Sequence, residues 1–176
     1  MTPSALNKHL KRCTKAELIE LLQTLALRNA AAQNFLSAKF DPSSPEPDFE
    51  RYKRIVHEEF FPEHGYGDGS PAIAFRMLQR VEEEATQPSQ VLDFLFFCVE
   101  TGIQFTNNYG DIDEEFYTAF EDLFERAAKL AIAINLSSQY RQRGQAIVDS
   151  TNGIGWGFHD ELSDIFDKYF TNEADA

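Results

Sequence analysis

The sequence has two cysteines, one tryptophan and no long uninterrupted apolar run among its 176 residues. Two cysteines, Cys13 and Cys98, cannot form a disulfide framework in a chain with this much apolar sequence, which favours a reducing compartment. No run of about 20 apolar residues is available to span a bilayer. No apolar stretch follows Met1, so we expect no secretory leader and a cytoplasmic location.

Basic residues are also scarce, at 16 Lys or Arg against 29 Asp or Glu, for a net charge of −13. A strongly acidic chain is repelled by phosphate backbones and anionic membranes, so we expect neither nucleic acid nor membrane as a partner. Residues 1–54 nevertheless carry +3 and the remainder −16. This split predicts a basic N-terminal element that docks on the acidic body or on an acidic partner; the alternative is a solvated helix face.

The usual catalytic motifs are missing. The chain has no His-Glu-x-x-His pair and no Gly-x-Ser-x-Gly elbow, and its glycine-rich loop at 65–70 lacks the Gly-Lys-Ser/Thr of a phosphate loop. Cys98 lies in an apolar run that gives no sign of a lowered thiol pKa. We therefore expect no cofactor and assign no catalytic residues.

A helical period of apolar residues runs through most of the chain, and no alternating run is long enough for a strand. Thr14 and Glu17 form a capping-box pattern. Residues 90–106 are apolar on nearly every side, which predicts a central helix; a buried strand over 94–99 is the rival, but it would have no sheet to join. The fold class is all-α, as one domain of about eight helices over residues 1–176, arranged as a bundle or a short HEAT-like stack.

Two segments should lie outside this regular structure. Three prolines within residues 41–47 disfavour helix and predict a linker. The last six residues, 171–176, should fray.

The stretch Gly-Ile-Gly-Trp-Gly-Phe-His-Asp at 153–160 holds the only tryptophan. We expect Trp156 to be buried against the central helix, with His159 and Asp160 beginning the last helix. Tyr-Gly-Asp occurs at 66–68 and again at 109–111, before two expected helices. A true repeat or a chance match in turns could produce this echo. The candidate ligand or partner residues are Trp156, His159, Asp160, Tyr109, Asp111, Tyr66 and Asp68.

Possible metal ligands are densest at residues 57–68, which include His57 and His64. Their spacing does not place them on one helical face as an i, i+4 pair. His159 could complete a distant set with them. Solvated charges are the alternative, and we expect no tightly held metal.

Three segments carry a resemblance to a known family: KAELIELL at 15–22, ETGIQFTNNYGDID at 100–113 and GIGWGFHDELSD at 153–164. Through them, nearly the whole chain resembles an uncharacterised bacterial family of unknown function. The resemblance implies a cytoplasmic single-domain protein and no catalytic residues. It also implies that 107–113 and 153–161 are the defining segments.

Three functions are compatible with these features. The absence of catalytic motifs favours a non-catalytic module that binds an unidentified protein. An acidic inhibitory or immunity-type protein against a basic partner is the second hypothesis. A small-ligand or metal-dependent activity at Trp156, His159 and Asp160 is the third. Self-association as a homo-oligomer is left open.

Overall fold

A computed structural model describes residues 3–40 and 48–171 of the chain. Within these ranges it contains nine α-helices, a short π-helical turn and no strand, which confirms the all-α class. The expected linker at 41–47 and all but the first residue of the expected frayed tail lie outside the described residues. Thr171 ends the π-helical turn, and its hydroxyl donates to Asp167 Oδ1 at 3.1 Å.

The chain divides into two compact units, residues 1–46 and 47–176. The first unit contains α1 (Pro3–Leu10), α2 (Lys15–Arg28) and α3 (Ala30–Phe40), and α2 packs against α3. The capping box is present, since the Thr14 side chain accepts from the Glu17 N–H and Glu17 accepts from the Thr14 N–H. No α2 residue is buried, and Phe35 of α3 is exposed. So small a unit supplies no second layer to cover these side chains. That the two units form one domain stays a prediction.

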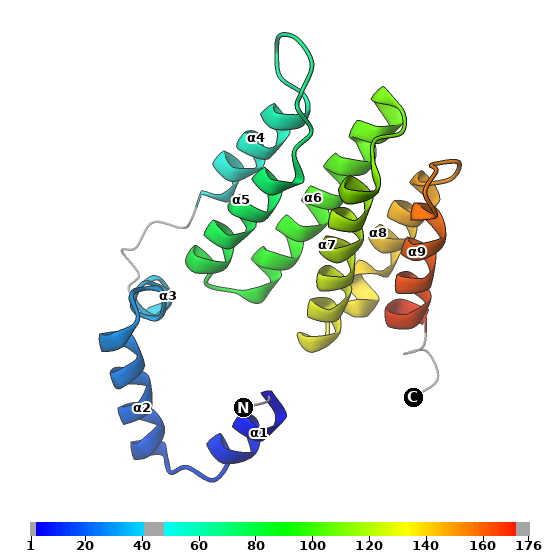
Figure 1. The fold of residues 1–176 in the computed structure, drawn as a ribbon. Helices are drawn as coiled ribbons and strands as arrows, with labels where there is room; N and C mark the ends of the chain where they lie inside the picture. Colours follow the sequence, from blue (N-terminus) through cyan, green and yellow to red (C-terminus); the bar gives the residue numbers. More distant parts are fainter. Residues whose placement is uncertain (1–2, 41–47, 172–176) are drawn as a thin grey trace. The chain divides into compact units, whose positions relative to one another are not determined.

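The second unit is built from three helical hairpins. They pair α4 (Phe49–Phe60) with α5 (Pro71–Glu84), α6 (Pro88–Tyr109) with α7 (Glu114–Ala133), and α8 (Ser137–Ser150) with α9 (Phe158–Phe166). Contacts also join α4 to α6 and α6 to α8, and α5 to α7 and α7 to α9. Two layers result, which matches the HEAT-like alternative, and Figure 1 shows the three hairpin loops at the same end.

The α6 helix lies at the centre, as its apolar sequence predicts, and phenylalanine dominates the core around it. Phe94 and Phe96 of α6 are fully buried, as are Phe120 and Phe124 of α7. Gly102 of α6 admits the Phe120 ring, because a Cβ on Gly102 would lie 2.4 Å from that ring. The close approach of α6 and α7 therefore depends on a residue without a side chain.

Charged groups fasten the C-terminal π-helical turn η1 (Asp167–Thr171) to α7. Glu125 of α7 forms ion pairs with Lys129 at 2.8 Å and with Lys168 at 3.3 Å. It also accepts a hydrogen bond from the Tyr169 hydroxyl at 2.7 Å. These partners, Lys129 most and then Tyr169, lower the pKa of the Glu125 carboxyl from its ordinary 4.5 to about 2. A depressed pKa means that the folded protein favours the charged carboxylate.

Glu125→Gln is expected to destabilise the protein above pH 4.5, and the difference from the parent should shrink as the pH falls from 4.5 toward 2. The effect at neutral pH should stay below about 1 kcal/mol, because solvent screens a partly exposed carboxylate. Urea unfolding of both proteins at pH 7 and pH 3 measures it, with Glu50→Gln in an exposed i, i+3 pair as control. An equal difference at both pH values would contradict the assignment.

Candidate functional site

The structure brings together the two segments that the sequence singles out, 107–113 and 153–160. The Gly155 N–H donates to Asp111 Oδ1 at 3.2 Å, and Asn107 Nδ2 donates to the Ser150 carbonyl at 3.0 Å. A Cβ on Gly155 would lie 2.9 Å from Asp111 Oδ2. The absence of a side chain at Gly155 therefore leaves room for the Asp111 carboxylate beside the backbone of the α8–α9 loop.

Tyr117 of α7 supports this junction, and the sequence analysis missed it. Its side chain is buried, and its ring centroid lies 4.9 Å from that of Phe158. Its hydroxyl donates to Asp111 Oδ1 at 3.2 Å, accepts from the Ile112 N–H at 3.3 Å and lies 2.8 Å from Thr106 Oγ1. A tyrosine within the apolar stripe of an expected helix was the available signal, because a buried hydroxyl needs a partner.

The expectation that Trp156 is buried is wrong: 61% of its surface is exposed. The fully buried aromatic of this stretch is Phe158, the first residue of α9. Gly157 adopts a left-handed conformation with φ 74°, and the helix begins directly after it. Phe158 shares the inward face of α9 with Leu162 and Ile165, at i, i+4 and i+7, whereas Trp156 precedes the helix and is not held to that face.

His159 and Asp160 lie in the first turn of α9, as the sequence predicts. Asp160 is exposed, in a position where its charge complements the helix N-terminus. His159 Nδ1 lies 2.9 Å from Thr151 Oγ1. The Thr151 hydroxyl donates its one proton to the Val148 carbonyl at 2.7 Å, so it accepts from the His159 Nδ1–H.

A hydroxyl beside an imidazole is the arrangement of a nucleophile and its base, but this pair does not suit that role. Thr151 is fully buried, and its proton is committed to the backbone. Cys98 is also buried, which raises the pKa of its thiol and keeps the sulfur protonated. Both groups have structural surroundings that withhold them from a substrate.

Tyr66 and Tyr109 meet edge to face, with ring centroids 6.0 Å apart. Tyr109 also packs on Phe105 at 4.9 Å and on Phe61 at 6.1 Å, which fixes it to the core. Tyr66 is 85% exposed and Tyr109 is 44% exposed. Together with Trp156 they place one exposed aromatic at each of the three hairpin loops, and we call this set the aromatic edge.

The three histidines considered as possible metal ligands have different surroundings. The His57 ring packs 5.3 Å from Phe61, His64 is exposed in the α4–α5 loop, and His159 is paired with Thr151. No three His, Cys, Asp or Glu side chains are grouped as metal ligands in residues 3–40 and 48–171. Over the same ranges, no helix combines the length and hydrophobicity needed to cross a bilayer.

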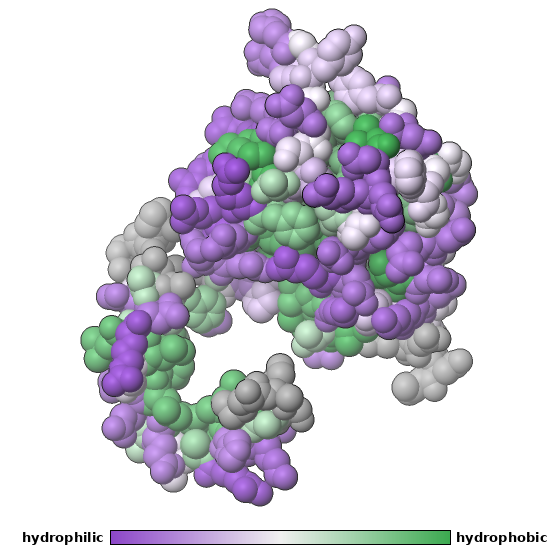
Figure 2. Space-filling view, in the orientation of Figure 1, coloured by the Kyte–Doolittle hydropathy of each residue, from purple (hydrophilic) through white to green (hydrophobic). Residues whose placement is uncertain are grey.

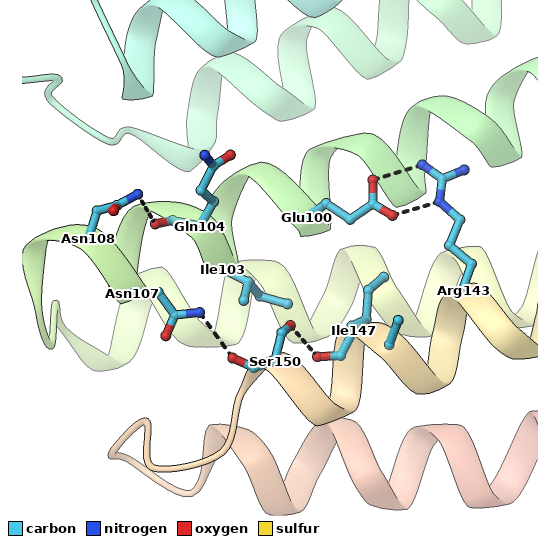
Figure 3. A pocket seen from close by; sticks show the side chains of 9 residues that line it. Glu100, Ile103, Gln104, Asn107, Asn108, Arg143, Ile147 and Ser150 are labelled. Atoms are coloured by element: carbon cyan, nitrogen blue, oxygen red, sulfur yellow. Dashed lines mark hydrogen bonds and ion pairs between the residues drawn. The ribbon is translucent and has the colours of Figure 1, made fainter.

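A groove of about 400 Å³ runs between α6 and α8 (Figure 3). Its polar groups are largely satisfied by one another: Arg143 holds Glu100 through two hydrogen bonds of 2.6 and 2.8 Å, and Asn108 donates to the Gln104 carbonyl at 2.9 Å. Arg143 also lies over the Phe96 ring at 5.0 Å. Because its charges are neutralised internally, this groove offers neither a reactive group nor a net charge to a ligand.

A second groove, of about 420 Å³, lies between α5 and α7 and includes Asp68 in its lining. Trp156, His159 and Asp160 line neither groove. Of the seven candidate residues, the structure therefore joins Tyr66 to Tyr109 directly and Asp111 to the backbone next to Trp156.

Comparison with known proteins leaves the site to be interpreted from its own geometry. The resemblance to a bacterial family stays a prediction. No family model, no curated protein and no solved structure matches this chain.

Proposed function

We propose that this chain is a non-catalytic protein-interaction module and that its aromatic edge contacts the partner. The observation that carries the proposal is the exposure of Trp156, the only tryptophan of the chain, whereas Phe158, two residues later, is fully buried. Trp and Tyr are the residues that most often dominate the binding free energy of protein interfaces. Leaving a large aromatic in water forgoes stabilisation of about 1.5–3 kcal/mol that burial by a partner would supply.

The aromatic edge is mounted on ordered structure. Tyr109 rests on Phe105, Tyr66 rests on Tyr109, and the loop that carries Trp156 is tied to Asp111 through Gly155. A surface held in place loses less conformational entropy when a partner covers it. These contacts favour recognition of a protein surface over a reaction.

The third hypothesis, a small-ligand or metal-dependent activity, has less support. Trp156, His159 and Asp160 line neither of the two grooves described above, and His159 is engaged by Thr151. A small molecule is usually enclosed by a concave pocket that buries most of its surface. The exposed Trp156 and Asp160 are better suited to contact a broad protein surface than to enclose a small molecule.

Replacing Trp156 by the photo-cross-linking amino acid p-benzoylphenylalanine should give one defined protein adduct in extract of cells that express the protein. The same amino acid at Gln139, an exposed position of α8, is the matched control and should not give that adduct. The captured protein is then purified, and its Kd is measured against the parent and Trp156→Ala. We expect Kd to rise about 30-fold, as for a central aromatic of an interface.

The proposal fails if both positions give the same adducts or if the Kd of the captured protein is unchanged by Trp156→Ala. Thermal denaturation of each variant accompanies the binding measurement. A variant that melts with the parent shows that the loss belongs to the surface and not to folding.

A further inference from the structure

The groove between α5 and α7, which we call the acidic groove, combines an apolar floor with a charged rim. Its floor includes Phe75 of α5, Ile112 of the α6–α7 loop and Phe116 of α7. It continues along the helices into a second hollow, which shares Phe75, Glu115 and Ala119 with it. In Figure 2, hydrophobic atoms gather over the region between α5 and α7 and hydrophilic ones frame them.

The rim carries charge of one sign. No lysine or arginine is found among the lining residues, whereas five carboxylates are, namely Asp68, Asp113, Glu114, Glu115 and Asp122. Several carboxylates elsewhere in the second unit do have basic partners: Glu84 pairs with Arg51, Glu100 with Arg143 and Glu125 with Lys129. Within residues 48–171, no ion pair involves a carboxylate of the rim.

Helix capping explains only part of this charge. Asp113 is the N-cap of α7 and accepts from the Phe116 N–H at 2.8 Å, and acidic residues in the first turn complement the helix dipole. Asp122 is two turns further along α7, and Asp68 comes from a different loop, so neither belongs to that helix end. Negative charge is thus concentrated among the residues that line this groove.

We propose that the acidic groove binds a cationic amphipathic segment of the partner protein, with aliphatic or aromatic side chains on the Phe75 floor and Lys or Arg side chains on the rim. The inference rests on the proposed interaction function and names the chemistry of its partner. Long basic side chains can lay their methylene stems on an apolar surface while their charged ends reach carboxylates. An amphipathic helix in a groove uses anchors at i, i+3 or i+4 and i+7.

Two residues of the aromatic edge are close in sequence to the groove lining, since Asp68 follows Tyr66 by two residues and Ile112 follows Tyr109 by three. One partner can therefore cover both surfaces. A second copy docked face to face through the same groove would instead set carboxylates against carboxylates.

The test uses the full chain and a fluorescent 18-residue peptide of leucine and lysine in an amphipathic helical pattern. A peptide with glutamate in place of lysine serves as the charge control. Fluorescence anisotropy gives Kd at physiological salt for the parent and two double variants of equal charge. Glu115→Gln with Asp122→Asn, the rim variant, removes two of the five rim charges, and Glu58→Gln with Asp149→Asn removes two exposed carboxylates from α4 and α8.

We expect the rim variant to weaken binding of the leucine–lysine peptide about tenfold and the control variant to change it less than about twofold. Phe75→Ala, checked for folding by circular dichroism, should also weaken it, and the glutamate peptide should not bind. Equal losses in both double variants would show attraction to net charge alone and would overturn the inference. No loss in the rim variant would overturn it too.

The two proposals can fail separately. If a partner captured through Trp156 binds the rim variant as tightly as the parent, the acidic groove is not its docking site, although the interaction function stands. If the leucine–lysine peptide requires the rim but Trp156 captures no protein, the aromatic edge is wrong and the groove stands.

Discussion

Replacing Phe158 by alanine is expected to lower the free energy of unfolding by about 3–5 kcal/mol, the usual cost of truncating a buried phenylalanine. Trp156→Ala, two residues earlier, should change it by no more than about 0.5 kcal/mol, as for an exposed side chain outside any special contact. The larger aromatic is therefore expected to matter less to folding than the smaller one.

The reason lies in where each ring goes. Phe158 is fully buried and packs 4.9 Å from the Tyr117 ring, so its removal leaves a cavity beneath the junction of the two loops. Tyr117 also holds Asp111 and the Ile112 N–H, and a cavity at Phe158 loosens the support for both. Trp156 is 61% exposed, and its loss opens no cavity.

Thermal denaturation of the parent and both variants measures the difference, with a shift of about 2–4 °C expected for each kcal/mol in a chain of this size. Phe158→Leu keeps most of the volume and should fall between Phe158→Ala and the parent. If Trp156→Ala melts lower than Phe158→Ala, the assignment of the two rings is wrong. The aromatic edge would then lose its main support.

Local patterns predicted the features that depend on neighbours in sequence. The capping box at Thr14 and Glu17 joins residues three apart, and both its backbone bonds are present. The start of the last helix at His159 and Asp160 likewise follows from adjacent residues. The central position of α6 was predictable because a helix that is apolar on every side has to be surrounded.

The direction of Trp156 was mispredicted because burial was inferred from size instead of register. Phe158, Leu162 and Ile165 follow the helical period, and extending that period backward includes Phe158 but not Trp156. The sequence therefore contained the correct answer. In the first unit, the helical period of the sequence predicted the apolar face of α2. A helical period does not specify what packs on that face, and no α2 residue is buried.

The contacts that build the candidate site were beyond local patterns. Asp111 and Gly155 are 44 residues apart, and the acidic groove combines residues from α5 and α7 with both preceding loops. Such contacts are set by how the hairpins stack, which a helical period does not specify. The echo of Tyr-Gly-Asp gave one useful hint, since its two copies and the Trp156-Gly157 pair occupy the loops of successive hairpins.

The packing of α6 on α7 makes a second large effect predictable at Gly102. Alanine in a helix interior is ordinarily about 1 kcal/mol better than glycine, so Gly102→Ala should stabilise an isolated helix. Here the new Cβ would lie 2.4 Å from the Phe120 ring. That ring is fully buried and surrounded by Phe60 at 6.0 Å and Phe116 at 4.7 Å, so it has little room to move.

We therefore expect Gly102→Ala to destabilise the protein by about 1–3 kcal/mol, the usual cost of overpacking. Gly144 of α8 is the matched control, since it is also buried inside a helix, but its Cβ would lie 3.2 Å from the Phe166 ring, and a shift of a few tenths of an ångström relieves that contact. Gly144→Ala should stay within about 1 kcal/mol of the parent, because the gain in helix propensity offsets the compression. Urea unfolding of both variants measures the difference, and Phe120→Leu should recover part of the stability lost in Gly102→Ala, because neighbouring substitutions are not additive. Equal stability of the two alanine variants would show that Phe120 can move aside and that α6 and α7 do not depend on the missing side chain.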